Sequence, residues 1–115
     1  MGNKWQSQTI QDAATTTGDG TIVQLGDANS LVVTVYGTST SFSITFKTAL
    51  TNSFDATQWS PIAGIRQDTQ TYTSTASVLS TSYVFDVSKW GYFKAQITAI
   101  SDGNVSVSYN TVMDS

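Results

Sequence analysis

The most regular pattern in the chain is an alternation of hydrophobic and polar residues over 92–100 (YFKAQITAI) and again over 105–109 (VSVSY). A two-residue period is typical of β-strands with one buried face. The two runs flank the turn pair Asp102-Gly103, which predicts a β-hairpin. Its outward face would carry Lys94 and Gln96 and would be exposed to solvent.

Matching the buried faces predicts the register of this hairpin. A two-residue loop would place Ile97 opposite Ser108 and mix the two faces. A three-residue loop, Ser101–Gly103, pairs Ile97 with Val107 and keeps both on the buried face. It also puts Gly103 at the position where the backbone is left-handed, a conformation that glycine adopts without steric cost.

Shorter runs with strand character recur along the rest of the chain, separated by turn signals rich in Gly, Asp, Asn and Ser. The run 31–36 (LVVTVY) is apolar on both faces and predicts a central strand that is covered on both sides. Residues 58–66 contain the only proline, Pro61, and predict an edge or bulged strand. Residues 1–12 are interpreted as an N-terminal arm or an edge strand. Further strands are predicted at 21–25, 42–47 and 83–87.

The composition also favours strands over helices. All eight acidic residues are Asp, which suits turns, and Ser and Thr make up about 30% of the chain. No segment of ten or more residues keeps a helical period. We predict an all-β protein of 115 residues, a single domain over 1–115 folded as an antiparallel two-sheet β-sandwich, Ig-like or jelly-roll-like. It would have about eight or nine short strands.

The absence of whole residue types excludes several functional classes. The chain has no Cys and no His, which removes disulfides, thiolate nucleophiles, zinc knuckles and the usual general base. Five scattered cations and a net charge of −3 give no basic footprint for nucleic acid. No apolar run approaches the ~20 residues of a membrane span, and no signal peptide is recognisable. We therefore expect no nucleic-acid partner, no membrane insertion, and synthesis in a cytoplasm.

The aromatic residues are the candidates for a binding surface. Trp59 and Trp90, together with Tyr36, Tyr72 and Tyr92, could form a platform on which sugar rings stack. The alternative is that Trp59 and Trp90 close the two ends of the core. Trp5, among polar residues near the start of the chain, is the candidate for docking on a neighbouring protein.

The acidic residues offer no clear catalytic or metal site. Five of them could ligate calcium from loops, but none occurs in tight Asp-x-Asp spacing, and each sits beside turn residues. Turn formation therefore explains them better. No two Asp are placed together for glycoside hydrolysis, and we predict no catalytic residue, no metal and no cofactor. The five are Asp19, Asp27, Asp55, Asp68 and Asp102.

Three segments resemble one family when taken in order. They are 14–25 (ATTTGDGTIVQL), 43–64 (SITFKTALTNSFDATQWSPIAG) and 83–110 (YVFDVSKWGYFKAQITAISDGNVSVSYN). Their order is similar to that in small β-sandwich modules of tailed-bacteriophage virion proteins, found in tails, baseplates and head decorations. The resemblance covers most of the chain and transfers no catalytic residue.

This resemblance implies a non-enzymatic structural protein of a phage or prophage virion. Such a protein would act by assembly, as a homo-oligomer that presents sandwich edges and end loops to other virion proteins. It would be made in the bacterial host cytoplasm and located in the virion. The alternative function is a carbohydrate-binding module that contacts host-surface glycans, because related sandwich modules bind sugars.

Overall fold

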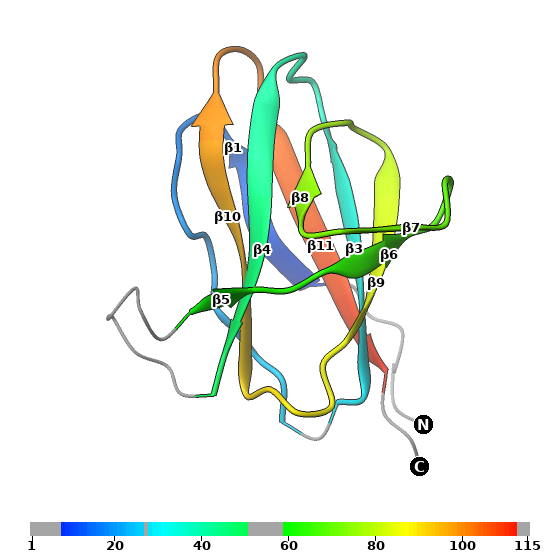
Figure 1. The fold of residues 1–115 in the computed structure, drawn as a ribbon. Helices are drawn as coiled ribbons and strands as arrows, with labels where there is room; N and C mark the ends of the chain where they lie inside the picture. Colours follow the sequence, from blue (N-terminus) through cyan, green and yellow to red (C-terminus); the bar gives the residue numbers. More distant parts are fainter. Residues whose placement is uncertain (1–7, 27, 51–58, 113–115) are drawn as a thin grey trace, which may run out of the picture.

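The computed structural model describes residues 8–26, 28–50 and 59–112, and these residues form two packed β-sheets (Figure 1). In chain order the strands are β1 (Gln8–Ala14), β2 (Val23–Gln24), β3 (Ser30–Gly37), β4 (Phe42–Ala49), β5 (Ser60–Pro61), β6 (Gly64–Arg66), β7 (Thr71–Thr73), β8 (Thr75–Ala76), β9 (Thr81–Asp86), β10 (Tyr92–Ile100) and β11 (Val105–Val112).

The predicted antiparallel two-sheet sandwich is confirmed. One sheet has six strands in the order β1-β11-β3-β9-β6-β7, and the other has five, with β2-β10-β4-β5 in line and β8 paired to β4. The strands are more numerous than predicted, because 58–66 divides into β5 in one sheet and β6 in the other, and because residues 71–76 form the short strands β7 and β8. No helix in the described ranges is long and apolar enough to cross a membrane.

The core lies between the sheets and is centred on aromatic rings. Phe46 of β4 lies 4.9 Å from Phe85 of β9, ring centre to ring centre, in an edge-to-face arrangement. Phe85 in turn lies 5.1 Å from Phe93 of β10, and Tyr83 lies 5.2 Å from Phe46. All four rings are at most 1% exposed. They join the two sheets, because Phe46 and Phe93 belong to one sheet and Tyr83 and Phe85 to the other.

The predicted hairpin at Tyr92–Tyr109 is wrong. β10 pairs with β4 and β2 in the five-stranded sheet, whereas β11 pairs with β3 and β1 in the six-stranded sheet. Val107 therefore lies opposite Val35 and not opposite Ile97. Alternation indicates that one face of each strand is buried. It is the same for two strands paired in one sheet and for two strands that face each other across the core, so it cannot distinguish these arrangements. Gly103 is left-handed as predicted, with φ of 58°.

Two loops connect the sheets at one end of the molecule. The chain passes from β3 to β4 through residues 38–41 and from β10 to β11 through 101–104, and Figure 1 shows both loops at one end of the sandwich. The carbonyl oxygen of Asn104 accepts hydrogen bonds from the backbone N–H groups of Thr38 (2.9 Å) and Ser39 (3.0 Å). These bonds hold the two crossing loops together.

Two further expectations change in detail. β3 is central, between β11 and β9, but its outward residues Val32 and Thr34 are only half-buried, so it is not covered on both sides. β1 is an edge strand of the six-stranded sheet, paired with β11 through two register irregularities. The rest of the predicted N-terminal arm, including Trp5, lies outside the described residues.

Candidate functional site

The structure separates the aromatic residues that were proposed as one surface. Trp59 is 7% exposed and lies on the outer side of the five-stranded sheet, under a lysine of β10. Trp90, in the turn between β9 and β10, is partly buried against the core. Tyr72 is 75% exposed on β7, at the edge of the other sheet. Trp5 lies outside the described ranges. The three described residues therefore lie on different parts of the molecule.

Lys94 is the most buried charge in the described part of the chain. The residue is 7% exposed, although it points outward from β10, which corrects the expectation of a solvated face. Its Nζ lies 3.2 Å from Oδ2 of Asp19 and 4.5 Å from the centre of the Trp59 ring. A carboxylate and an aromatic face both stabilise a cation that has lost water contacts. Lys94 also stands opposite Lys47 of β4.

Asp102 links the two crossing loops through its carboxylate. Oδ1 accepts hydrogen bonds from Ser39 Oγ (3.1 Å) and from the backbone N–H groups of Thr40 (3.0 Å) and Ser41 (3.2 Å), and Oδ2 accepts one from Thr40 Oγ1. These donors, the Thr40 hydroxyl first, hold the pKa of Asp102 below its ordinary value. Both carboxylate oxygens of Asp102 therefore accept hydrogen bonds from the loop 38–41 and hold it to the loop 101–104.

Asp68 and Asp86 also have local roles. The side-chain hydrogen bond from Arg66 lowers the pKa of Asp68, and Arg66 Nε lies 2.6 Å from Asp68 Oδ1. Asp86 accepts hydrogen bonds from the backbone N–H and hydroxyl of Ser88, and these lower its pKa. Asp27 and Asp55, two of the calcium candidates, lie outside the described residues. Within the described ranges no three Asp side chains gather as a metal site would require.

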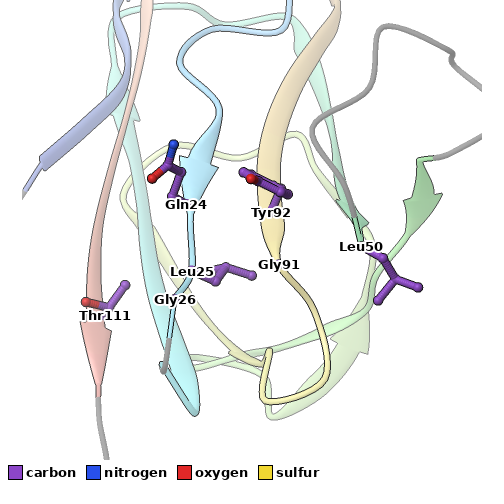
Figure 2. Close-up of a pocket in the computed structure, with 7 residues that line it drawn as sticks. All are labelled: Gln24, Leu25, Gly26, Leu50, Gly91, Tyr92 and Thr111. Atoms are coloured by element: carbon purple, nitrogen blue, oxygen red, sulfur yellow. The ribbon is translucent and has the colours of Figure 1, made fainter.

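An open hollow of about 470 Å³ lies where β2 and β10 approach β11 (Figure 2). Figure 2 shows Gln24 and Tyr92 side by side, with Leu25 pointing toward Gly91. Leu50 and Thr111 complete the rim together with Gly26. The lining holds an amide, a hydroxyl, the phenol of Tyr92 and apolar groups, and it contains no carboxylate and no cationic side chain.

The outer face of the six-stranded sheet carries a row of mostly apolar side chains with Asn110 at one end, which we call the outer row. The strand register aligns Asn110, Val32, Val84, Ile65 and Tyr72 directly across β11, β3, β9, β6 and β7. Val32 and Val84 point away from the core, because their neighbours along each strand are core residues, as Tyr83 and Phe85 are around Val84. Residues directly paired across strands share a face of the sheet, which places the other three on the same outer face. Tyr72 is exposed and the other four are half-buried.

Sequence reasoning did not find the outer row, because its members are far apart in the chain and only strand pairing aligns them. A partial signal was present. Apolar residues stand at adjacent positions in 31–33 (LVV) and 83–85 (YVF), so each of these strands must carry an apolar residue on its outward face.

A second tyrosine lies on the same face. Tyr36 of β3 is 43% exposed, and its hydroxyl is 3.0 Å from the hydroxyl of Ser108. Thr34 and Ser82, between Tyr36 and the outer row, are joined by a 3.1 Å hydrogen bond. The face thus combines an apolar row with uncharged hydroxyl groups.

Comparison with known proteins gives the fold and the family. The fold matches the crystal structure of the SPBc2 prophage-derived protein YomS with a TM-score of 0.84 and 22% identity, over 92% of this chain and 90% of YomS. It also matches the PBSX exported protein XepA, with a TM-score of 0.85 and 23% identity over 92% of this chain. This match spans only 37% of the XepA chain.

No curated protein sequence matches the chain. The predicted relationship to phage proteins is confirmed by the two prophage proteins named above. The model of the XepA family matches residues 4–110, which is nearly the whole sequence. The chain therefore belongs to the XepA family.

Proposed function

We propose that this chain is a non-enzymatic structural protein of a phage or prophage particle that acts by protein–protein assembly. The observation that carries the proposal is its membership of a family named for a prophage protein, together with a fold shared over nine-tenths of its length with YomS and XepA. Because both of these proteins come from prophages, a place in a phage particle is the most direct assignment.

The chemistry of the described residues supports a role without catalysis. Asp19, Asp68, Asp86 and Asp102 each contact a donor or cation of the fold, and the chain supplies no His, Cys or Glu. A general acid or base needs a titratable group within reach of substrate and with a pKa near the working pH. The pKa values of Asp68, Asp86 and Asp102 are instead lowered by local hydrogen bonds.

The form of the sheet edges favours assembly through faces and end loops. β2 and β5 are two residues long and β5 contains Pro61, while β7 is three residues long. β1 is irregular, with register shifts on both sides of Gln11 and a positive φ of 48° at Ala13. Short, proline-containing or bulged edge strands are the devices by which sheets avoid edge-to-edge pairing.

Particle incorporation tests the proposal. Phage particles would be induced from a host that carries an epitope-tagged copy of the gene and purified by density-gradient centrifugation. We expect the tagged protein to co-sediment with intact particles, and separation of heads from tails would then place it in one of them. The proposal is wrong if the tagged protein is abundant in the lysate and absent from intact particles, heads and tails.

The alternative, a carbohydrate-binding module, has weaker support. Trp59 is buried under Lys94, and Trp90 is partly buried against the core. Stacking on a sugar ring requires an exposed aromatic face, which leaves Tyr72 and Tyr36 as candidates. A glycan array with the protein and with Tyr72→Ala tests this function: loss of an array signal in the variant would favour it, and no signal at millimolar sugar would exclude it.

A further inference from the structure

We propose that the outer face of the five-stranded sheet binds an acidic segment of a partner protein, and that Lys47 makes the contact by pairing with a carboxylate of that segment. The inference rests on the proposed function, since it names the chemistry of a partner for an assembly protein. Its starting point is the pairing of β4 with β10, which sets Lys47 directly opposite Lys94. These are two of the five cationic residues of the chain.

The two lysines are neighbours on the outer face of the sheet. Each is flanked along its strand by fully buried residues, so both point away from the core. Directly opposed residues of an antiparallel pair have Cβ atoms about 5 Å apart, and like charges at such positions destabilise the sheet. The fold therefore gains nothing from this charge pairing, which indicates a use in binding.

The fold compensates only one of the two charges. Asp19 Oδ2 lies 3.2 Å from Lys94 Nζ, and the Trp59 ring covers the same ammonium group. Lys47 is half-buried, and within the described ranges no carboxylate lies at ion-pair distance from it. Two lysines and one aspartate leave one positive charge without a partner. Because Lys47 has lost part of its contact with water, a carboxylate placed beside it is screened less than at a fully exposed lysine.

The paired positions around the lysines are uncharged. They are Gln24, Tyr92 and Ala49 in the row on one side, Gln96, Thr45 and Thr75 in the row on the other side, and Pro61 beside Lys47. The charges among these outward positions are thus both positive, although the whole chain has a net charge of −3. A positive area on an acidic protein attracts a negatively charged partner and orients it.

A carboxylate is the anion that this face already accommodates. Asp19 reaches Lys94 from the connection between β1 and β2, and its side chain is still 46% exposed. An acidic side chain of a partner can approach Lys47 in the same way. Gln96 and Thr45, which are paired with each other next to the lysines, supply an amide and a hydroxyl that can donate hydrogen bonds to the backbone of the same segment.

Titration with a short acidic peptide tests the surface. The probe is blocked hexaglutamate, with hexaglutamine as its uncharged counterpart, and the indole N–H signal of Trp59 in nuclear magnetic resonance spectra reports binding beside the lysines. We expect hexaglutamate alone to shift this signal, with an affinity that falls as salt rises. Lys47→Gln should raise the dissociation constant at least about threefold. Lys89→Gln removes the same charge from an exposed turn between β9 and β10 and should leave the affinity nearly unchanged.

Three outcomes of this titration would overturn the proposal. One is a Trp59 signal that hexaglutamate does not move. Another is equal weakening by Lys47→Gln and Lys89→Gln, which would show attraction by net charge and not by this face. The third is tighter binding of tripolyphosphate than of hexaglutamate at equal ionic strength, which would assign the face to phosphate groups.

Stability separates a binding role of Lys47 from a role in the fold. Because Lys47→Gln removes a like-charge contact, the urea midpoint should stay unchanged or rise. A lower midpoint would show that the lysine supports the fold and would contradict the proposal. Sedimentation of the variant without peptide should equal that of the native chain. A difference would assign this face to a second copy and would overturn the proposed partner.

The two proposals fail separately. Peptide binding is measured on the purified chain, whereas particle incorporation is measured in a lysate. A chain that is found in particles but does not bind hexaglutamate would overturn the acidic partner and leave the structural role standing. A chain that binds hexaglutamate through Lys47 but is absent from particles would overturn the structural role and leave the binding face standing.

Discussion

At the scale of single residues, several of the described charged groups make specific contacts within the fold. Lys94 lies between Asp19 and the Trp59 ring, and Asp102 lies at the meeting of two loops. Composition indicated turn formation for the Asp residues, and the positions of Asp68, Asp86 and Asp102 agree with it. The burial of Lys94 was not predictable, because alternation placed it on an outward face, and its neighbours Trp59 and Asp19 are far from it in the sequence.

Asp102 predicts a particular dependence of stability on pH. Because its pKa is lowered in the folded state, its contribution is present above the unfolded-state pKa and is lost as the pH falls through the folded-state value. Asp102→Asn should therefore lower Tm at neutral pH, and the difference from the native chain should shrink below about pH 4. Thermal unfolding followed by circular dichroism between pH 7 and pH 2 measures this.

Asp12→Asn is the matched control for this prediction, since Asp12 is exposed on β1 and the charge change is the same. Its Tm difference should be small across the range. A Tm difference for Asp102→Asn that persists undiminished at pH 2 would show that the carboxylate charge is not what holds the two loops.

Position 64 requires glycine because any side chain there would collide with the core, and not because of its backbone φ angle. A Cβ at this position would lie 2.6 Å from Cε2 of Phe85. Gly64→Ala should therefore lower the free energy of unfolding by about 1–3 kcal/mol, the usual cost of overpacking. Urea denaturation measures it. In a Phe85→Leu background the added methyl has more room, so the same substitution should cost less there; equal costs in both backgrounds would contradict the steric explanation.

At the scale of elements, the sequence predicted where most strands lie and which face each buries, but not which strands pair. Phe42, Ile44 and Phe46 alternate along the predicted strand 42–47, and all three are buried. The pairing of β10 with β11 was wrong, because alternation is the same for a hairpin and for two strands on opposite sides of the core. The outer row was missed for a related reason, since it exists only once β6, β7, β9, β3 and β11 are aligned.

A substitution at Gly103 tests the packing of the loop that connects β10 to β11. Its φ is 58°, and an added Cβ would lie 2.8 Å from the backbone nitrogen of Ser39. Gly103→Ala should cost at least about 1–2 kcal/mol of unfolding free energy from the left-handed conformation alone. Gly18→Ala is the control, because an added Cβ there meets no atom within 4 Å. Equal midpoints in urea for the two variants would contradict the assigned packing of this loop.

At the scale of the whole molecule, the described edges are short or irregular while one face is broad and nearly uncharged. This contrast is consistent with a module that contacts other proteins through faces and loops. Such a role requires the two sheets to keep their relative position, and that position depends on the aromatic residues between them. The stability of the sandwich is therefore a condition for its use as a building unit.

Phe46 is the residue on which this stability depends most directly. It is fully buried and contacts the rings of Tyr83, Phe85 and Phe93 from both sheets. Phe46→Ala should lower the unfolding free energy by about 3–5 kcal/mol, a large part of the ~5–15 kcal/mol available to a domain of this size. Tyr36→Ala, at a position that is 43% exposed, should cost far less. Urea denaturation of both variants decides the matter: if their midpoints fall by similar amounts, the aromatic cluster does not hold the two sheets together.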